Sequence, residues 1–181
     1  MAQYIAFLRG INVGGHRIKM DQLRVHFEEM GLTDVSTFIA SGNVIFSADS
    51  EDVGDLSARI EQHLAQKLGY EVATFLRTPA QLDAIATLEL PEGEDGAESF
   101  SSIYVSLLRG PAPDDMRARF ADLATESDRF WFSGSEMYWG LQGKISESPL
   151  FGKGLELAFA GAPTTSRNMN TLRRLAAKLA P

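Results

Sequence analysis

Three basic residues surround a glycine-rich stretch near the start of the chain, in YIAFLRGINVGGHRIKM. Arg9, Arg17 and Lys19 occur here, and no acidic residue lies between Arg9 and Lys19. Glycine amides beside a guanidinium group are typical of backbone nests that bind phosphate-like anions. Asn12 adds a polar side chain to the same stretch. These residue types therefore predict a binding site for a small anionic ligand.

The same stretch also allows a structural interpretation. Gly14 and Gly15 can supply positive φ in a wide turn, and Asn12 can bond to its own backbone. The glycine spacing matches neither the dinucleotide fingerprint G-x-G-x-x-G nor the P-loop pattern. Both interpretations of the loop stay open, and neither includes a nucleotide-binding fingerprint.

A second polar group lies in FIASGNVIF. Ser41 and Asn43 flank Gly42 there, and residues of these types favour the positive φ of a tight hairpin turn. The sequence does not contain the G-x-S-x-G elbow that positions a hydrolase serine. Ser41 and Asn43 are therefore candidate ligand-binding residues, and the sequence gives no support to a serine nucleophile.

A third polar group lies near the C-terminus, where Arg167 and Asn168 precede a helix predicted at 169–179. Asn168 or Ser166 can cap that helix. Alternatively, Arg167 and the free amides of the helix can hold an anion. Arg167 and Asn168 complete the candidate ligand-binding set.

Composition limits the chemistry that is available. The chain of 181 residues contains no cysteine, which excludes thiolate catalysis and cysteine metal sites. Its three histidines, His16, His26 and His63, show no metal-binding spacing. The sequence therefore predicts no metal and no cofactor. It leaves open whether the protein is an enzyme, because no base–nucleophile pair is visible.

The charge and hydropathy of the chain exclude some classes of binding partner. The net charge of −7 argues against a general nucleic-acid binder, which is normally basic. No apolar stretch has the length of a membrane span, and residues 1–20 lack the order of a signal peptide. The sequence predicts a cytoplasmic protein without a membrane partner, and a monomer is the favoured state.

The elements that must position these residues form a repeat. YIAFLRG from Tyr4 resembles YVSLLRG from Tyr104. Each copy continues with an amphipathic helix, then an extended pair around Ser-Gly. Finally, LRTPAQL around Arg77 resembles SRNMNTL around Arg167. We interpret the chain as an internal duplication of one divergent unit.

Each copy reads as β-α-β-β-α-β, the ferredoxin-like order. In the first copy, the apolar and turn residues predict strands at 4–10 and 72–77, strands flanking Ser41-Gly42, and helices at 20–30 and 52–68. In the second copy, they predict strands at 103–109, 129–133 and 136–141, helices at 114–124 and 150–160, and a short strand before Arg167. The predicted fold class is α+β, with antiparallel sheets covered by helices.

The predicted domains are a first ferredoxin-like unit at 1–90, an acidic linker at 91–99 and a second unit at 100–181. Strand 4–10 is apolar on both faces, so we expect the two sheets to associate into one compact body. Within the first unit, the end of strand 4–10 and the Ser41 hairpin lie at opposite ends of neighbouring strands, or at one end if the hairpin curls.

Three ordered motifs resemble the bacterial domain-of-unknown-function 1697 family: LRGINVGG followed by Lys-Met, then SGNVIF, and the C-terminal T-S-R-N-x-N-T. The likeness runs from Leu8 to Leu172. It implies a duplicated α+β protein with ferredoxin-like halves and no assigned activity. Family members often carry Trp where this chain has Met169. The matching motif residues are Arg9, Gly10, Asn12, Gly14, Gly15, Lys19, Met20, Ser41, Gly42, Asn43, Arg167 and Asn168.

Together these patterns favour a binding module for a small, phosphate-bearing ligand held by the basic residues. An enzyme that acts in the same polar pocket and a protein-interaction module are the alternatives.

Overall fold

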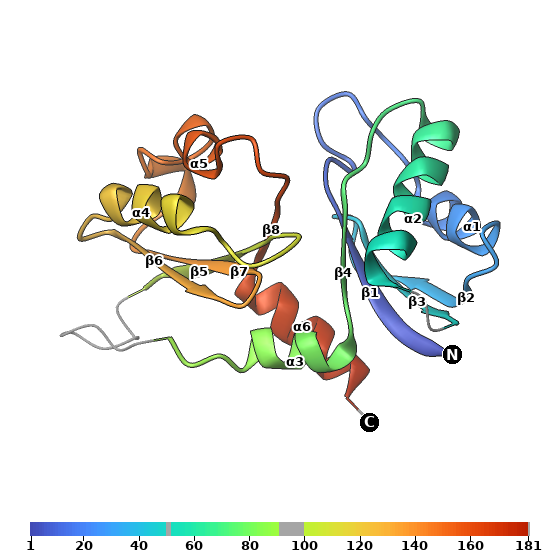
Figure 1. Cartoon of the computed structure of the whole chain (residues 1–181). Coiled ribbons are helices and arrows are strands. Elements are labelled where there is room, and N and C mark those ends of the chain that lie inside the picture. The colour runs from blue at the N-terminus through green and yellow to red at the C-terminus, as the bar shows by residue number, and fades with distance from the viewer. Residues whose placement is uncertain (50–51, 91–99, 181) are drawn as a thin grey trace. The chain divides into compact units, whose positions relative to one another are not determined.

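A computed structural model describes residues 1–49, 52–90 and 100–180. The chain forms two compact units, Met1–Leu82 and Asp83–Pro181, which are drawn in Figure 1. The linker predicted at 91–99 lies outside the described residues.

The first unit follows the predicted order of elements, which are β1 (Ala2–Leu8), α1 (Met20–Glu28), β2 (Thr33–Thr37), β3 (Asn43–Ala48), α2 (Val53–Leu68) and β4 (Thr74–Arg77). Helix α3 (Pro79–Ala86) follows β4 and crosses the boundary between the units. The strands form one antiparallel sheet in the order β2-β3-β1-β4. This is the ferredoxin-like arrangement, with α1 and α2 on the same face of the sheet (Figure 1).

The core of the first unit lies between that face and the two helices. Tyr4, Ala6 and Leu8 alternate along β1 and point into it. Helix α1 contributes Phe27, and α2 contributes Ile60, both with no exposed surface. Burial of a side chain of this size stabilises the fold by about 1.5–3 kcal/mol, so this apolar stripe fixes how α1 and α2 sit on the sheet.

The ends of α2 are set by local chemistry. The Asp52 carboxylate accepts hydrogen bonds from the amides of Gly54 and Asp55, which satisfies two of the helix's unpaired donors. Gly69 ends the helix at φ 77°, a conformation that glycine adopts without steric cost.

The second unit repeats the topology with β5 (Ser102–Leu107), α4 (Asp114–Leu123), β6 (Asp128–Ser133), β7 (Glu136–Leu141), a 3-10 turn (Ile145–Glu147), α5 (Lys153–Phe159), β8 (Thr165–Asn168) and α6 (Met169–Leu179). Its sheet is antiparallel in the order β6-β7-β5-β8. Phe120 and Phe159 pack there at a centroid separation of 4.8 Å, in a core that also contains Trp139. The predicted α+β class with two ferredoxin-like units is confirmed.

Arg77 and Arg167, which the sequence repeat relates to each other, occupy corresponding positions in the two sheets. Arg77 lies opposite Ile5 in the first sheet, and Arg167 lies opposite Val105 in the second. Each guanidinium donates through Nη1 to the carbonyl of the preceding residue, at 2.8 Å and 2.9 Å respectively. The origin of the units by internal duplication stays a prediction.

The units differ most where the first strand joins the first helix. Residues 9–19 connect β1 to α1, whereas residues 108–113 make the shorter connection from β5 to α4. The second connection is rich in proline and lines a small pocket of about 170 Å³ together with Ala162 and Pro163.

No helix among the described residues is long and apolar enough to span a membrane.

Candidate functional site

The register of the first sheet brings two of the predicted motifs to the same end. Strand β1 runs antiparallel to β3, with Phe7 opposite Asn43. One position further on, the Leu8 amide donates to the Gly42 carbonyl at 2.8 Å. The end of β1 and the β2–β3 connection therefore meet, so the second of the two arrangements expected from the sequence is the one the structure has.

Asn12 fastens the glycine-rich loop to this connection. Its Nδ2 donates to the Ala40 carbonyl at 3.1 Å, and its Oδ1 accepts from the Ile18 amide at 2.8 Å. Asn12 itself has φ 57°, a conformation that asparagine tolerates better than most residues. The side chain thus closes the loop and ties it to the hairpin.

Further contacts hold the loop against the connection between α2 and β4. The Arg9 amide donates to the Ala73 carbonyl at 2.9 Å. The His16 ring lies over Tyr70, with 3.8 Å between ring centroids. The loop is therefore anchored to two different parts of the first unit.

Asn43 shapes the hairpin from inside. It has no exposed surface, and its Nδ2 donates to the Phe38 carbonyl at 2.9 Å and to Ser41 Oγ at 3.0 Å. An amide cannot act as the general base that a serine nucleophile needs. The contacts of Ser41 and Asn43 with each other therefore stabilise the turn.

The β2–β3 connection spans residues 38–42 and is longer than the tight turn that the sequence suggests. Gly42 has φ 80°, and a Cβ placed there would lie 3.0 Å from Ile11 Cβ and 3.1 Å from Leu8 Cβ. Ile39 has φ 52° although it is β-branched, and its side chain is exposed. Positive φ at a β-branched residue is a strained conformation, so the surrounding contacts hold this turn in one shape.

The basic side chains are on the outside of this fixed loop. Arg9, Arg17 and Lys19 are all exposed, and Arg17 Nη1 donates to the Asn12 carbonyl at 3.1 Å. In the described part of the chain, the side chains of Arg9 and Lys19 form no hydrogen bond or ion pair. Gly14 and Gly15 are exposed as well, with no atom within 4 Å of a Cβ built on them.

Arg167 and Asn168 belong to the second unit. Asn168 Oδ1 accepts from the Asn170 amide at 2.8 Å and caps α6, which was one of the two interpretations of the sequence. Arg167 is only 8 % exposed, and its Nη1 also donates to Thr165 Oγ1 at 2.8 Å. Burial lowers the pKa of Arg167 from its usual value to about 10.

A polar cluster in the first unit was missed by sequence reasoning. Glu29 Oε2 lies 3.2 Å from His26 Nδ1, 3.2 Å from His63 Nε2 and 3.0 Å from Lys67 Nζ. Its members come from the end of α1 and from α2, far apart in the sequence. His26-x-x-Glu29 on one helix was the available signal, because residues three apart face the same side.

The fold and this loop define a two-unit α+β protein whose first unit has an elaborated β1–α1 connection. The chain belongs to the DUF1697 family of proteins of unknown function, whose model matches residues 1–138. The match covers Arg9–Lys19 and the Ser41 hairpin, whereas Arg167 and Asn168 lie beyond it.

Among solved structures, the chain is similar to a conserved bacterial protein, SP0830, from Streptococcus pneumoniae. The two share 24 % sequence identity with a TM-score of 0.79, over 99 % of this chain and 98 % of the other. This likeness supports the fold. No curated protein matches the sequence.

Proposed function

We propose that the first unit binds a small, phosphate-bearing anion at the loop formed by residues 9–19. The observation that carries this proposal is a fixed loop with exposed cations. Asn12 and Asn43 are engaged in holding the loop and the hairpin. Arg9 and Lys19 remain exposed, as do Gly14 and Gly15, which lie between them in the sequence. Preorganisation of this kind lowers the entropic cost of binding.

The start of α1 adds to the support. Lys19 is the N-cap residue, and its side chain does not cap the helix. The amides of the first turn thus carry the partial positive charge that attracts anions to helix N-termini. Lys19 contributes a full charge at the same place, in a chain whose net charge is −7.

A buried hydroxyl near the loop also supports a polar occupant. The Tyr70 ring packs against the ring of His16 in the loop. Its hydroxyl is buried and has no hydrogen-bond partner among the described residues. An unpaired buried hydroxyl costs about 1–3 kcal/mol, which a water molecule or a ligand oxygen would relieve.

The proposal is limited to the first unit. Asn168 is engaged in capping α6, and Arg167 donates to Thr165 and Ser166. The proposal therefore requires no contribution from either residue. The ligand-binding residues are then Arg9, Asn12, Gly14, Gly15 and Lys19, with Ser41 and Asn43 supporting them.

The test is a titration of the full chain with inorganic phosphate and with pyrophosphate. The amide NMR signals of residues 9–19 report the binding. We expect saturable shifts in the wild type, and binding weaker by about tenfold or more in Arg9→Gln and Lys19→Gln. Arg24→Gln is the matched control, because Arg24 is an exposed arginine of α1 that pairs with Glu28. Wild-type affinity in both loop variants would overturn the proposal.

A further inference from the structure

The cluster of His26, Glu29 and His63 has the dimensions of a metal site. Glu29 Oε2 lies 3.2 Å from one nitrogen of each histidine, and the three donor groups lie within 4.8 Å of one another. Zinc bonds of about 2.0–2.2 Å place neighbouring ligands of a tetrahedral ion about 3.3–3.6 Å apart. The two separations from Glu29 are therefore close to those that one bound ion imposes, and the third lies within 4.8 Å.

The donor types indicate which ions fit. Two imidazole nitrogens and one carboxylate oxygen suit zinc and its divalent transition-metal neighbours, whereas calcium and magnesium prefer sites made of oxygen atoms. Three protein ligands also leave at least one coordination position for water or another small ligand. The site is thus of the open kind, unlike a closed structural zinc site.

The helices that carry the ligands are firmly seated. His26 and Glu29 flank Phe27, and His63 precedes Leu64; neither Phe27 nor Leu64 has exposed surface. These apolar neighbours fix the faces of α1 and α2 that meet at the cluster. Glu29 also stands at the C-cap of α1, where the helix dipole favours a cation.

Lys67 forms an ion pair with the Glu29 carboxylate. Its Nζ lies 3.0 Å from Glu29 Oε2, and its side chain is 40 % exposed. An exposed lysine is a flexible point charge and can withdraw into solvent when an ion replaces it.

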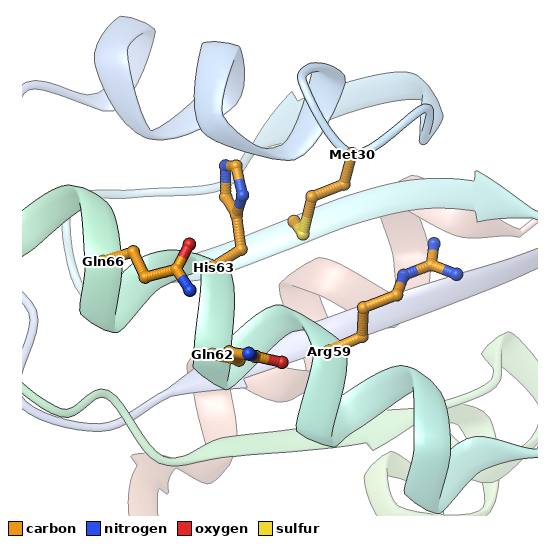
Figure 2. Close-up of a pocket in the computed structure, with 5 residues that line it drawn as sticks. All are labelled: Met30, Arg59, Gln62, His63 and Gln66. Carbon is orange, nitrogen blue, oxygen red and sulfur yellow. The ribbon is translucent and has the colours of Figure 1, made fainter.

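Space for further ligands lies beside His63. His63 lines a pocket of about 430 Å³ together with Met30, Arg59, Gln62 and Gln66. Figure 2 shows the His63 side chain rising from α2 between Gln66 and Met30. A metal ion held by His63 would have this pocket next to it.

We propose that His26, Glu29 and His63 bind one divalent transition-metal ion, with zinc as the representative, in exchange for the Lys67 ammonium group. The two histidines ligate through Nδ1 of His26 and Nε2 of His63. This metal site is separate from the anion site proposed at residues 9–19 and does not depend on it. It also departs from the metal-free expectation drawn from histidine spacing, which takes no account of how α1 and α2 pack.

The experiment is a zinc titration of the full chain against a chromophoric chelator, which reports affinity and stoichiometry. We expect one ion per chain. The affinity should fall by more than about tenfold in His26→Ala, His63→Ala and Glu29→Gln, a loss at least as large as that from an outer-shell partner. Lys67→Met should bind zinc more tightly, because the competing cation is gone.

Two matched variants control for general effects. His16→Ala removes the remaining histidine of the chain, and Glu28→Gln changes the glutamate beside Glu29; both should bind zinc like the wild type. Circular dichroism and thermal unfolding check that each variant is folded, and zinc should raise the melting temperature of the wild type and not of His63→Ala. Equal affinity in the wild type, His26→Ala and His63→Ala would overturn the proposal.

Discussion

Asn12 in the loop after β1 donates a 3.1 Å hydrogen bond to the carbonyl of Ala40, which lies 28 positions later in the chain. The same side chain accepts from the Ile18 amide. LRGINVGG and SGNVIF thus form one continuous structure at one end of the first sheet. A change in either motif should therefore be detected in the other.

Replacement of Asn12 should loosen the loop. Asn12→Asp keeps an acceptor for Ile18 but loses the donor to Ala40, so we expect a loss of about 1–2 kcal/mol in the free energy of unfolding. Urea denaturation measures this loss. Gln22→Glu makes the same amide-to-acid change on exposed α1 and should stay within about 0.5 kcal/mol of the wild type. An equal effect of the two substitutions would contradict the role of Asn12 in holding the loop to the hairpin.

Three glycines of the two motifs should respond differently to alanine. Gly42→Ala combines φ 80° with Cβ contacts of 3.0 Å and 3.1 Å, so we expect a loss of about 2–4 kcal/mol. Gly14→Ala meets no atom but has φ 59° and should lose about 1–2 kcal/mol. Gly15→Ala has neither problem and should be neutral within about 0.5 kcal/mol. Thermal and urea unfolding of the series tests this order, and a destabilised Gly15→Ala would contradict the open space around that position.

The topology could be predicted from the sequence because it depends on local patterns. Apolar alternation and helical spacing define the elements, and the repeat relates Arg77 to Arg167 before their registers are known. The shape of the β2–β3 connection could not be predicted in this way. Positive φ at Ile39 contradicts its intrinsic preference, and the connection is held by the long-range hydrogen bond from Asn12 to Ala40.

The candidate site could be predicted only in part, for a similar reason. The basic loop was visible as composition, and its contact with Ala40 depends on the pairing of β1 with β3. The cluster of His26 and His63 depends on the packing of α1 against α2, which no spacing rule reports. The burial of Arg167 is likewise a property of the folded second unit, whereas the sequence shows only a cation near a helix start.

A buried carboxylate should be essential to the second unit. Asp128 is 1 % exposed, and its Oδ1 accepts from Trp139 Nε1 at 2.9 Å and from Ser148 Oγ at 3.0 Å. Asp128→Asn keeps one amide oxygen for these donors but removes the charge and the second carboxylate oxygen, so we expect a loss of about 1–2 kcal/mol. Tryptophan fluorescence during urea unfolding measures it. Asp122→Asn, at an exposed site of α4, should change stability by less than about 0.5 kcal/mol. A similar small effect at Asp128 would mean that its hydrogen bonds contribute little.

The ion pair between Lys67 and Glu29 should make stability depend on acid pH. Lys67, followed by His26, lowers the pKa of Glu29 from 4.5 to about 2. Because the folded-state pKa is the lower one, the stabilisation is present above about pH 4.5 and is lost as the pH falls towards about 2. In metal-free protein, Lys67→Met should raise the pKa of Glu29 in a carboxyl NMR titration, and its stability deficit should shrink across this window. Lys178→Met, on the exposed side of α6, should leave the Glu29 titration unchanged. An unaltered Glu29 pKa in Lys67→Met would exclude this lysine as the main cause.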